Sequence, residues 1–276
     1  MKFLSKKQEK VNGTSLSILS KHWNTRSGFF SNIFSSIKMK SNEKLPDKMF
    51  YTSRLLKTPT NKYFLSLCLP LNENQVHGNI KEEKILFIDP GSKVFITGYD
   101  PSGEVITCGK NDIGRIARLL HYRRKLQSKI KTTKMDIRKK NKHKVAELRI
   151  GEKISNLVDE LHRKLAKWLC ENYTQVFIPR LNFHKLGNLY KKEKAKMASW
   201  SHCTFLKRLI SKSREYQCKI IEVKEDYTSK TCSNCGNVKK VMYGRTYNCK
   251  GCNLVFDRDI NASKNILLKF FTERAV

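Results

Sequence analysis

The stretch CKGCNLVFDRDINASKNIL, residues 249–267, joins two kinds of chemistry within a short distance. Cys249 and Cys252 stand two residues apart, which is a spacing typical of metal-binding turns. Two aspartates, Asp257 and Asp259, then open a stretch with helical periodicity. The chain around them is strongly basic, with 56 Lys and Arg against 24 Asp and Glu. The fold therefore has to explain why a metal-binding turn leads directly into an acidic helix start.

A second cysteine pair indicates a closed zinc site. Cys232 and Cys235 precede Cys249 and Cys252, with thirteen residues between the pairs. Two such turns present four thiolates to one Zn²⁺ and leave no open position, so we expect structural zinc in a ribbon over residues 232–253. Disulfides or a redox-active pair would not explain two matched pairs. The other five cysteines are scattered, which favours a reducing intracellular compartment, whether nucleus or cytoplasm.

The aspartates suggest a second metal site. In FDRDINASKNILLKF the helical repeat places Asp259 on the same face as Ala262 and Ile266, while Asp257 suits the helix N-cap. An inward carboxylate needs a partner, and from the sequence an ion pair and a metal ion are equally open for Asp259. Asp89 ends the apolar run ILFID before a Pro-Gly turn, where a lone aspartate is usually a turn former. Two such carboxylates in a basic chain favour Mg²⁺ placed for phosphodiester chemistry.

The hydrophobic pattern predicts a mixed α/β sheet with a long basic helical insertion. Residues 1–48 are expected to be a basic, poorly ordered segment, and residues 49–83 to contain one strand, at 62–71. A basic loop is expected at 185–197. The further predicted strands lie at 84–100, which holds two runs around a turn, and at 103–109, 174–181 and 218–227. A long amphipathic helix or helical hairpin is predicted from Asn111 to about Leu169, and shorter helices at 201–216 and 257–271.

The charge distribution predicts a polyanionic partner. The formal net charge is +32, and between Arg115 and Lys144 there are thirteen Lys and Arg against a single acid. Such a run is often a solvated helix face, but this density favours a surface that follows a phosphate backbone. The start, MKFLSKKQEK, lacks the apolar core of a secretory signal, and no stretch is apolar enough to predict a membrane span.

These motifs resemble a known family. FIDPG, the cysteine pairs after YTSKTCSNCG, and DRDINASKNIL are similar to the RuvC-like nuclease of transposon-encoded TnpB proteins, and YTSKTC looks closer to the Fanzor branch of eukaryotes and their viruses. The resemblance, from Lys84 to Leu268, implies an RNase H-like nuclease domain at 84–231 and 254–276, interrupted by the zinc ribbon. It also implies a guide RNA, Mg²⁺-dependent cleavage of DNA, transposition and recombination, and catalytic roles for Asp89 and Asp259.

The third acid of the family requires a choice. Its usual position falls near Pro179 and Arg180, where this chain has no carboxylate, but some family members carry a relocated glutamate near the next strand. Strand alternation places Glu225 on the face of Ile221 and Val223, whereas Glu222 lies on the other face. We therefore expect Asp89, Glu225 and Asp259 to bind Mg²⁺ and catalyse cleavage, with Glu222 as the alternative and a surface ion pair as the non-catalytic role for either glutamate.

Two other functions compete with a nuclease. The part of the chain before residue 84 is short for the family, so a truncated, catalytically inactive nucleic-acid-binding protein is the main alternative. A basic zinc-ribbon protein of ribosomal type would explain the charge and the cysteines, but not Asp89 or Asp259.

Overall fold

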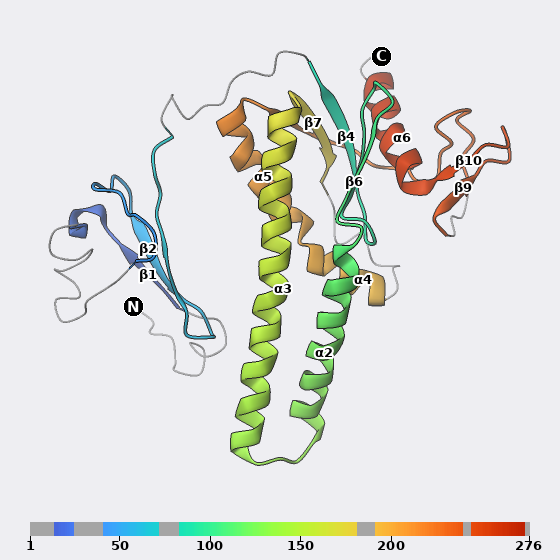
Figure 1. Cartoon of the computed structure of the whole chain (residues 1–276). Coiled ribbons are helices and arrows are strands. Elements are labelled where there is room, and N and C mark those ends of the chain that lie inside the picture. Colours follow the sequence, from blue (N-terminus) through green and yellow to red (C-terminus); the bar gives the residue numbers. More distant parts are fainter. Residues whose placement is uncertain (1–13, 25–40, 72–82, 181–190, 240–243, 274–276) are drawn as a thin grey trace. The chain divides into compact units, whose positions relative to one another are not determined.

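The computed structural model describes residues 14–24, 41–71, 83–180, 191–239 and 244–273 (Figure 1). The chain divides into two compact units. The first comprises residues 1–73 with 137–149, and the second comprises residues 74–136 with 150–276. Within the described residues, no helix is both long and apolar enough to cross a membrane.

The first unit contains a small antiparallel sheet. Strands β1 (Thr14–Ile18), β2 (Ser53–Lys57) and β3 (Tyr63–Ser66) pair in that order, and the 3-10 helix η1 (Ser20–His22) follows β1. β1 corrects the expectation that residues 1–48 are poorly ordered, although 1–13 and 25–40 lie outside the described residues. TSLSI has no apolar run of its own, so its strand depends on pairing with the distant β2. The predicted strand at 62–71 is confirmed as the shorter β3, whereas β2 corrects the expectation that residues 49–83 contain one strand.

The second unit is built on the predicted mixed sheet. Strands β4 (Ile85–Pro90), β5 (Ile96–Tyr99) and β6 (Val105–Cys108) form an antiparallel meander. β7 (Gln175–Pro179) pairs in parallel with β4, and β8 (Lys219–Val223) pairs in parallel with β7. The strand order is therefore β6-β5-β4-β7-β8, which puts β4 at the centre. Because the central parallel strands are covered on both faces, their sequences are continuous apolar runs.

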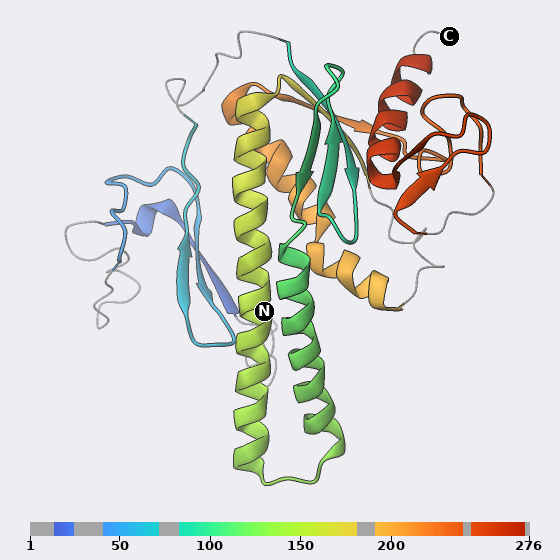
Figure 2. The ribbon, with the colours of Figure 1, turned by 45° about the vertical axis from the view of Figure 1, so that its right-hand side comes forward.

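The two faces of this sheet carry different helices, as Figure 2 shows. Leu86 and Ile88 of β4 point toward one face, where they pack with α2 (Asp112–Thr132), residues 150–172 of α3 (Ile137–Asn172) and α5 (His202–Tyr216). Phe87 points toward the other face and packs with Phe177 of β7 and Ile266 of α6 (Arg258–Thr272). Because strand side chains alternate, Asp89 belongs to the same face as Phe87. The sheet therefore presents Asp89 to the α6 side.

Helix α4 (Lys191–Trp200) corrects part of the loop expected at 185–197; residues 185–190 lie outside the described part of the chain. The segment has good helix formers but no apolar stripe to signal a helix. Its end is held by tertiary contacts, because Trp200 is fully buried and its indole N–H donates to the carbonyl of Ser92 at 3.0 Å. Long-range packing therefore stabilises a helix that the local pattern does not predict.

Two buried histidines stack on the same phenylalanine in the core. The rings of His162 and His202 lie 5.1 and 4.7 Å from that of Phe95. His162 Nε2 donates to the carbonyl of Trp200 at 2.8 Å, and its Nδ1 lies 3.1 Å from Arg208, so the neutral ring is satisfied on both sides. Burial lowers the pKa of each histidine to about 4. Both rings are therefore neutral in the folded protein at neutral pH.

This arrangement predicts acid destabilisation. Above pH 6.5 the histidines are neutral in both states, whereas between about pH 6.5 and 4 only the unfolded chain takes up their protons. We expect each histidine to lower the free energy of unfolding by about 2 kcal/mol at pH 5 relative to pH 8. Urea unfolding of the wild type and of His202→Gln at both pH values measures this, with His121→Gln as a control at an exposed position. An equal pH dependence in wild type and His202→Gln would contradict the prediction.

Candidate active site and zinc site

Asp89 lies near the carboxyl end of the central strand. It pairs with Thr97 of β5, and its side chain is half-buried on the α6 side of the sheet. The Pro90-Gly91 turn that follows is tight, because a Cβ on Gly91 would stand 2.6 Å from the carbonyl oxygen of Val94. The carboxylate is thus held at a strand edge, where α/β folds commonly place their binding sites.

Asp259 lies in the first turn of α6, the helix that covers the same face. Asp257 is the N-cap, as predicted: its Oδ1 accepts from the backbone N–H of Asp259 at 2.8 Å and of Ile260 at 3.3 Å. The predicted inward face is also confirmed, since Ala262 and Ile266 are buried. The Asp259 side chain is only 16% exposed, so it is directed toward the sheet rather than toward solvent.

Arg258 supplies the ion pair that the sequence left open for Asp259. Its guanidinium lies 3.3 Å from Oδ1 of Asp259. From DRD the resemblance implied a role for Asp259 only, and no role was expected for Arg258. Arg258 is next to Asp259 in the sequence, but only the folded structure shows that its guanidinium pairs with the Asp259 carboxylate.

Glu225 and Glu222 lie on different faces, as strand alternation predicts. Glu225 follows the end of β8 and is half-buried, on the side of Val223, which packs with the α6 cluster. Glu222 is more exposed, and its Oε2 lies 3.9 Å from Arg180 in a surface ion pair. It lines a small cavity of about 140 Å³ together with His202 and other residues on the α5 side of the sheet. Glu225 is therefore the glutamate on the face of Asp89 and Asp259.

The carboxyl of Asp89 responds to the charges of the other two acids. The pKa of Asp89 is raised well above its ordinary value, first by burial, then by the negative charges of Asp259 and Glu225, and Arg258 offsets this in part. Each of these charges must therefore lie close enough to be felt at Asp89. A carboxyl whose ionisation is disfavoured by burial and by two neighbouring acids is stabilised in its charged form by added positive charge, as a bound cation would supply.

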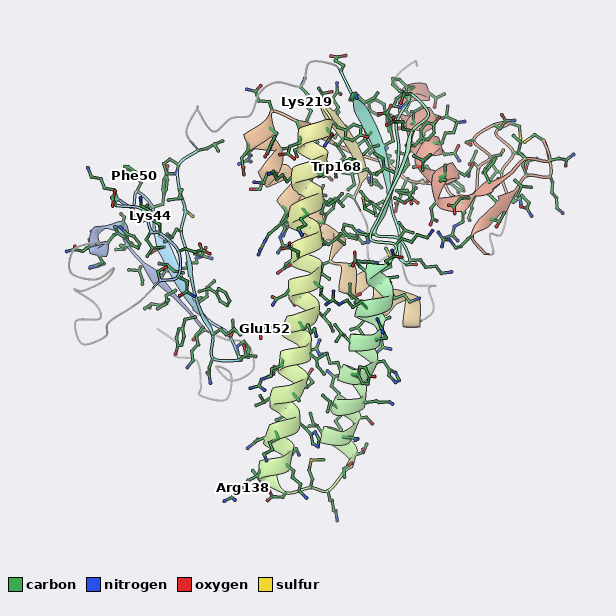
Figure 3. The ribbon with its side chains drawn as sticks, in the orientation of Figure 1. Lys44, Phe50, Arg138, Glu152, Trp168 and Lys219 are labelled. Atoms are coloured by element: carbon green, nitrogen blue, oxygen red, sulfur yellow. The ribbon has the colours of Figure 1, made fainter. Side chains whose placement is uncertain are left out.

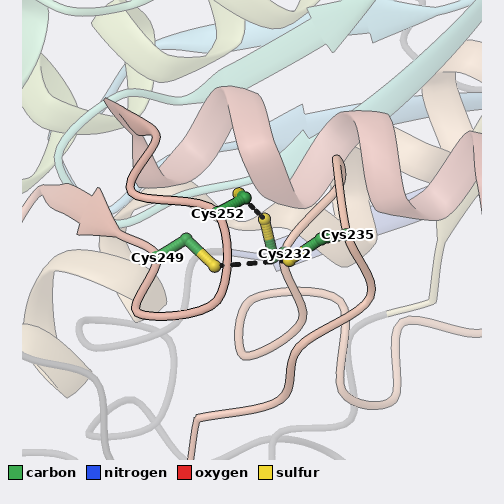
Figure 4. A group of neighbouring side chains, drawn as sticks. All are labelled: Cys232, Cys235, Cys249 and Cys252. Carbon is green, nitrogen blue, oxygen red and sulfur yellow. Dashed lines mark hydrogen bonds between the residues drawn. The ribbon is translucent and has the colours of Figure 1, made fainter.

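The four cysteines of the ribbon converge on one point (Figure 4). Their Sγ atoms all lie within 4.8 Å of one another, with 3.7 Å from Cys232 to Cys252 and 3.4 Å from Cys235 to Cys249. A tetrahedral Zn²⁺ with Zn–S bonds of about 2.3 Å implies sulfur separations of about 3.8 Å, so the geometry fits zinc. Within the described residues, these cysteines alone form so tight a ligand group. In the described part of the chain, Asp89, Glu225 and Asp259 do not form a ligand group as tight as this one.

The turns behind the cysteines are built to hold thiolates. Gly251 donates its backbone N–H to Sγ of Cys249 at 3.3 Å. Although burial opposes ionisation, backbone N–H groups of Cys252 and Gly251 lower the pKa of Cys249 to about 6. Beneath the site, the fully buried Tyr247 of β9 (Thr246–Asn248) stacks on Phe256 of β10 (Val255–Asp257) at 5.4 Å. The ribbon thus has a small core and four candidate zinc ligands.

Basic side chains are frequent on the helices α2 and α3. Figure 3 shows long side chains along α2 and α3, with Arg138 near the start of α3. On α2, exposed basic residues recur over its whole length: Arg115, Arg118, Arg124, Lys125 and Lys129. Such a row of cations suits a phosphate backbone.

Comparison with known proteins agrees with this layout. Residues 202–266, which include α5, β8, the ribbon and the start of α6, match the Cas12f1-like TNB domain family. The chain is 30% identical over 202 residues to TnpB-like protein L79 of Acanthamoeba polyphaga mimivirus, an alignment covering 68% of this chain and 37% of that protein. The chain therefore spans little more than a third of the length of this curated relative.

Two further comparisons concern Cas12f proteins. The chain is 24% identical over 121 residues to the CRISPR-associated endodeoxyribonuclease Cas12f1 of Sulfoacidibacillus thermotolerans, covering 43% of this chain and 29% of that protein. Its fold is similar to a chain of a CRISPR-Cas12f ternary complex, with a TM-score of 0.52 and 18% identity, covering 78% of this chain and 45% of that one. The TNB match and the mimivirus relative show that the chain belongs to the TnpB-type family.

Proposed function

We propose that this protein is a Mg²⁺-dependent DNA endonuclease of the RNA-guided TnpB and Fanzor type, with Asp89, Glu225 and Asp259 as its catalytic metal ligands. The observation that carries the proposal is the raised pKa of Asp89, to which burial, Asp259 and Glu225 contribute in that order. Three acids from distant parts of the chain lie toward one face of the sheet, and the charges of Asp259 and Glu225 disfavour ionisation of Asp89. Placing negative charges close together is unfavourable in the absence of metal. A purely structural role does not require this arrangement, whereas a site for a divalent metal ion does.

The roles of the residues follow from their positions. Asp89 on the rigid central strand and Asp259 on a capped helix would present fixed oxygen ligands, and Glu225 would complete the set from the end of β8. Mg²⁺ at these carboxylates would acidify the attacking water and stabilise the leaving oxygen of the cleaved phosphodiester. Arg258, close to Asp259, is placed to balance charge while the metal sites fill. The cysteine site would hold zinc in a structural role, because all four positions are protein ligands.

The partners of this activity are nucleic acids. The +32 charge and the exposed cations of α2 support binding to phosphate backbones, with affinity that falls steeply as salt is added. One relative is a CRISPR-associated endodeoxyribonuclease, which supports DNA as the substrate. Another, the "Putative RNA-guided DNA endonuclease" of Streptomyces pristinaespiralis, supports a guide RNA as the source of sequence specificity.

The test is a cleavage assay with the purified chain. DNA is incubated over a Mg²⁺ titration, with and without the RNA that co-purifies with the protein. We expect cleavage that requires both Mg²⁺ and the RNA, and that is lost when EDTA is added. DNA or RNA binding without cleavage at any divalent-ion concentration would instead support the inactive nucleic-acid-binding derivative.

The two glutamates provide a matched pair of variants. We expect Glu225→Gln to reduce the cleavage rate by about 100-fold or more, since it removes a metal ligand, while Glu222→Gln stays within about threefold of the wild type because it breaks only a surface ion pair. Single-turnover cleavage rates at saturating Mg²⁺ measure both. Equal losses in the two variants, or a larger loss for Glu222→Gln, would contradict the assignment of the third acid.

A further inference from the structure

Two asparagines of α6 bond to the segment that runs from Glu225 to the first zinc-binding turn. Asn261 and Asn265 are one helical turn apart and almost fully buried, with 1% and 5% of their surfaces exposed. Both Nδ2 groups donate to the carbonyl of Thr231, at 2.7 Å from Asn261 and 2.6 Å from Asn265. The helix that carries Asp259 is therefore fastened by side chains to a neighbouring irregular segment.

Asn265 is connected to Glu225 by hydrogen bonds through Thr228. Nδ2 of Asn265 also donates to the carbonyl of Thr228 at 2.8 Å. Thr228 is buried, and its hydroxyl and backbone N–H donate to the carbonyl of Glu225 at 2.9 and 3.3 Å. Two successive hydrogen-bonded steps thus connect the carboxamide of Asn265 to the backbone of the proposed third acid.

Asn261 is hydrogen-bonded to the first zinc-binding turn. Oδ1 of Asn261 accepts from the backbone N–H of Ser233 at 2.9 Å, one residue after Cys232. The same asparagine donates to Thr231 on the other side of that cysteine. The first zinc-binding turn is therefore held against α6 through both groups of one buried carboxamide, a bidentate contact that leaves little freedom in its placement.

These contacts point to a role beyond local stability. We propose that Asn261 and Asn265 are positioning residues, which couple the zinc-binding turns to the carboxylate site by holding Glu225 in register with Asp259. Irregular segments move more than helices, and Glu225 lies on such a segment just after β8. Without the asparagines Glu225 would keep its charge but lose its fixed distance from the other two acids. The inference rests on the proposed function of these acids as metal ligands.

The test measures metal affinity rather than cleavage. Mn²⁺ binding to zinc-loaded wild type, Asn265→Ala and Ser263→Ala is titrated by calorimetry, with zinc content measured by mass spectrometry. Ser263 is the matched control, because it is buried in the same helix but its hydroxyl donates to Ile260 of that helix. We expect Asn265→Ala to keep its zinc and to bind Mn²⁺ about tenfold more weakly, and Ser263→Ala to stay within about twofold of wild type.

A milder variant covers the case in which Asn265→Ala fails to fold. Thr228→Val removes only the hydroxyl that donates to Glu225, at nearly constant shape, and should weaken Mn²⁺ binding about threefold while zinc is retained. Wild-type Mn²⁺ affinity in folded Asn265→Ala, or in Thr228→Val, would overturn the positioning role alone. A wild type whose Mn²⁺ binding is absent, or is unaffected by Asp89→Asn, would overturn the proposed function and the inference with it.

Discussion

Asp89→Asn is expected to abolish Mg²⁺-dependent cleavage and, in the same protein, to raise its resistance to unfolding in the absence of divalent ions. Cleavage should fall by about 1,000-fold, because a ligand on the central strand is lost. Stability should rise because burial and the charges of Asp259 and Glu225 act against the ionised Asp89, and asparagine removes that charge at the same size. Thermal unfolding in EDTA-free buffer without added metal, beside single-turnover cleavage rates, measures both effects.

The control for this variant is Asp100→Asn. Asp100 is buried and directly follows a strand, β5, and its Oδ1 accepts from the backbone N–H of Ser102, so its side chain forms a turn. We expect it to retain cleavage and to gain no stability. The contradicting result is a lower unfolding temperature in Asp89→Asn and an unchanged one in Asp100→Asn. It would show that Asp89 stabilises the fold rather than serving as a metal ligand.

Cys249→Ser should remove zinc, unfold the ribbon and eliminate cleavage, although Cys249 is not one of the proposed catalytic residues. Structural zinc sites contribute on the order of 10 kcal/mol to folding, far more than the small core around Tyr247 can replace. The loss should spread to cleavage because the first zinc-binding turn is bonded to α6 and Asp259 lies in the first turn of that helix. Zinc content, limited proteolysis of residues 227–257 and cleavage rates measure the three effects.

Cys203→Ser is the control for a cysteine outside the cluster, since Cys203 is exposed on α5. It should keep its zinc, its resistance to proteolysis and its cleavage rate. If Cys249→Ser lost zinc but cut DNA at the wild-type rate, the ribbon would be independent of the carboxylate site, and the coupling through Asn261 would be wrong.

Local patterns predicted the parts of the site that depend on local geometry. The N-cap role of Asp257 and the inward face of Asp259 follow from helical periodicity, and both are confirmed. Strand alternation likewise predicts that Glu225 and Glu222 lie on different faces, and Glu222 forms a surface ion pair with Arg180. These predictions succeeded because the repeat of a helix or strand dictates which side chains share a face.

Features that depend on contacts between distant segments were not predictable in this way. Strand β1 forms only by pairing with residues nearly forty positions later, and the end of α4 is held by the packing of Trp200. The roles of Asn261 and Asn265 depend on where the segment before Cys232 folds back. The i, i+4 spacing of the two asparagines was a usable signal that they share a helix face, but their partners lie 30 and 37 residues earlier in the chain.

The most direct test is to locate divalent metal in the protein itself. Crystals of the zinc-loaded chain grown with Mn²⁺ are measured at wavelengths that separate manganese from zinc by anomalous scattering. We expect a zinc peak among Cys232, Cys235, Cys249 and Cys252, and manganese peaks bound by oxygens of Asp89, Glu225 and Asp259. Manganese absent from these three carboxylates at saturating concentration, or bound only elsewhere, would contradict the assignment of this site as a nuclease centre.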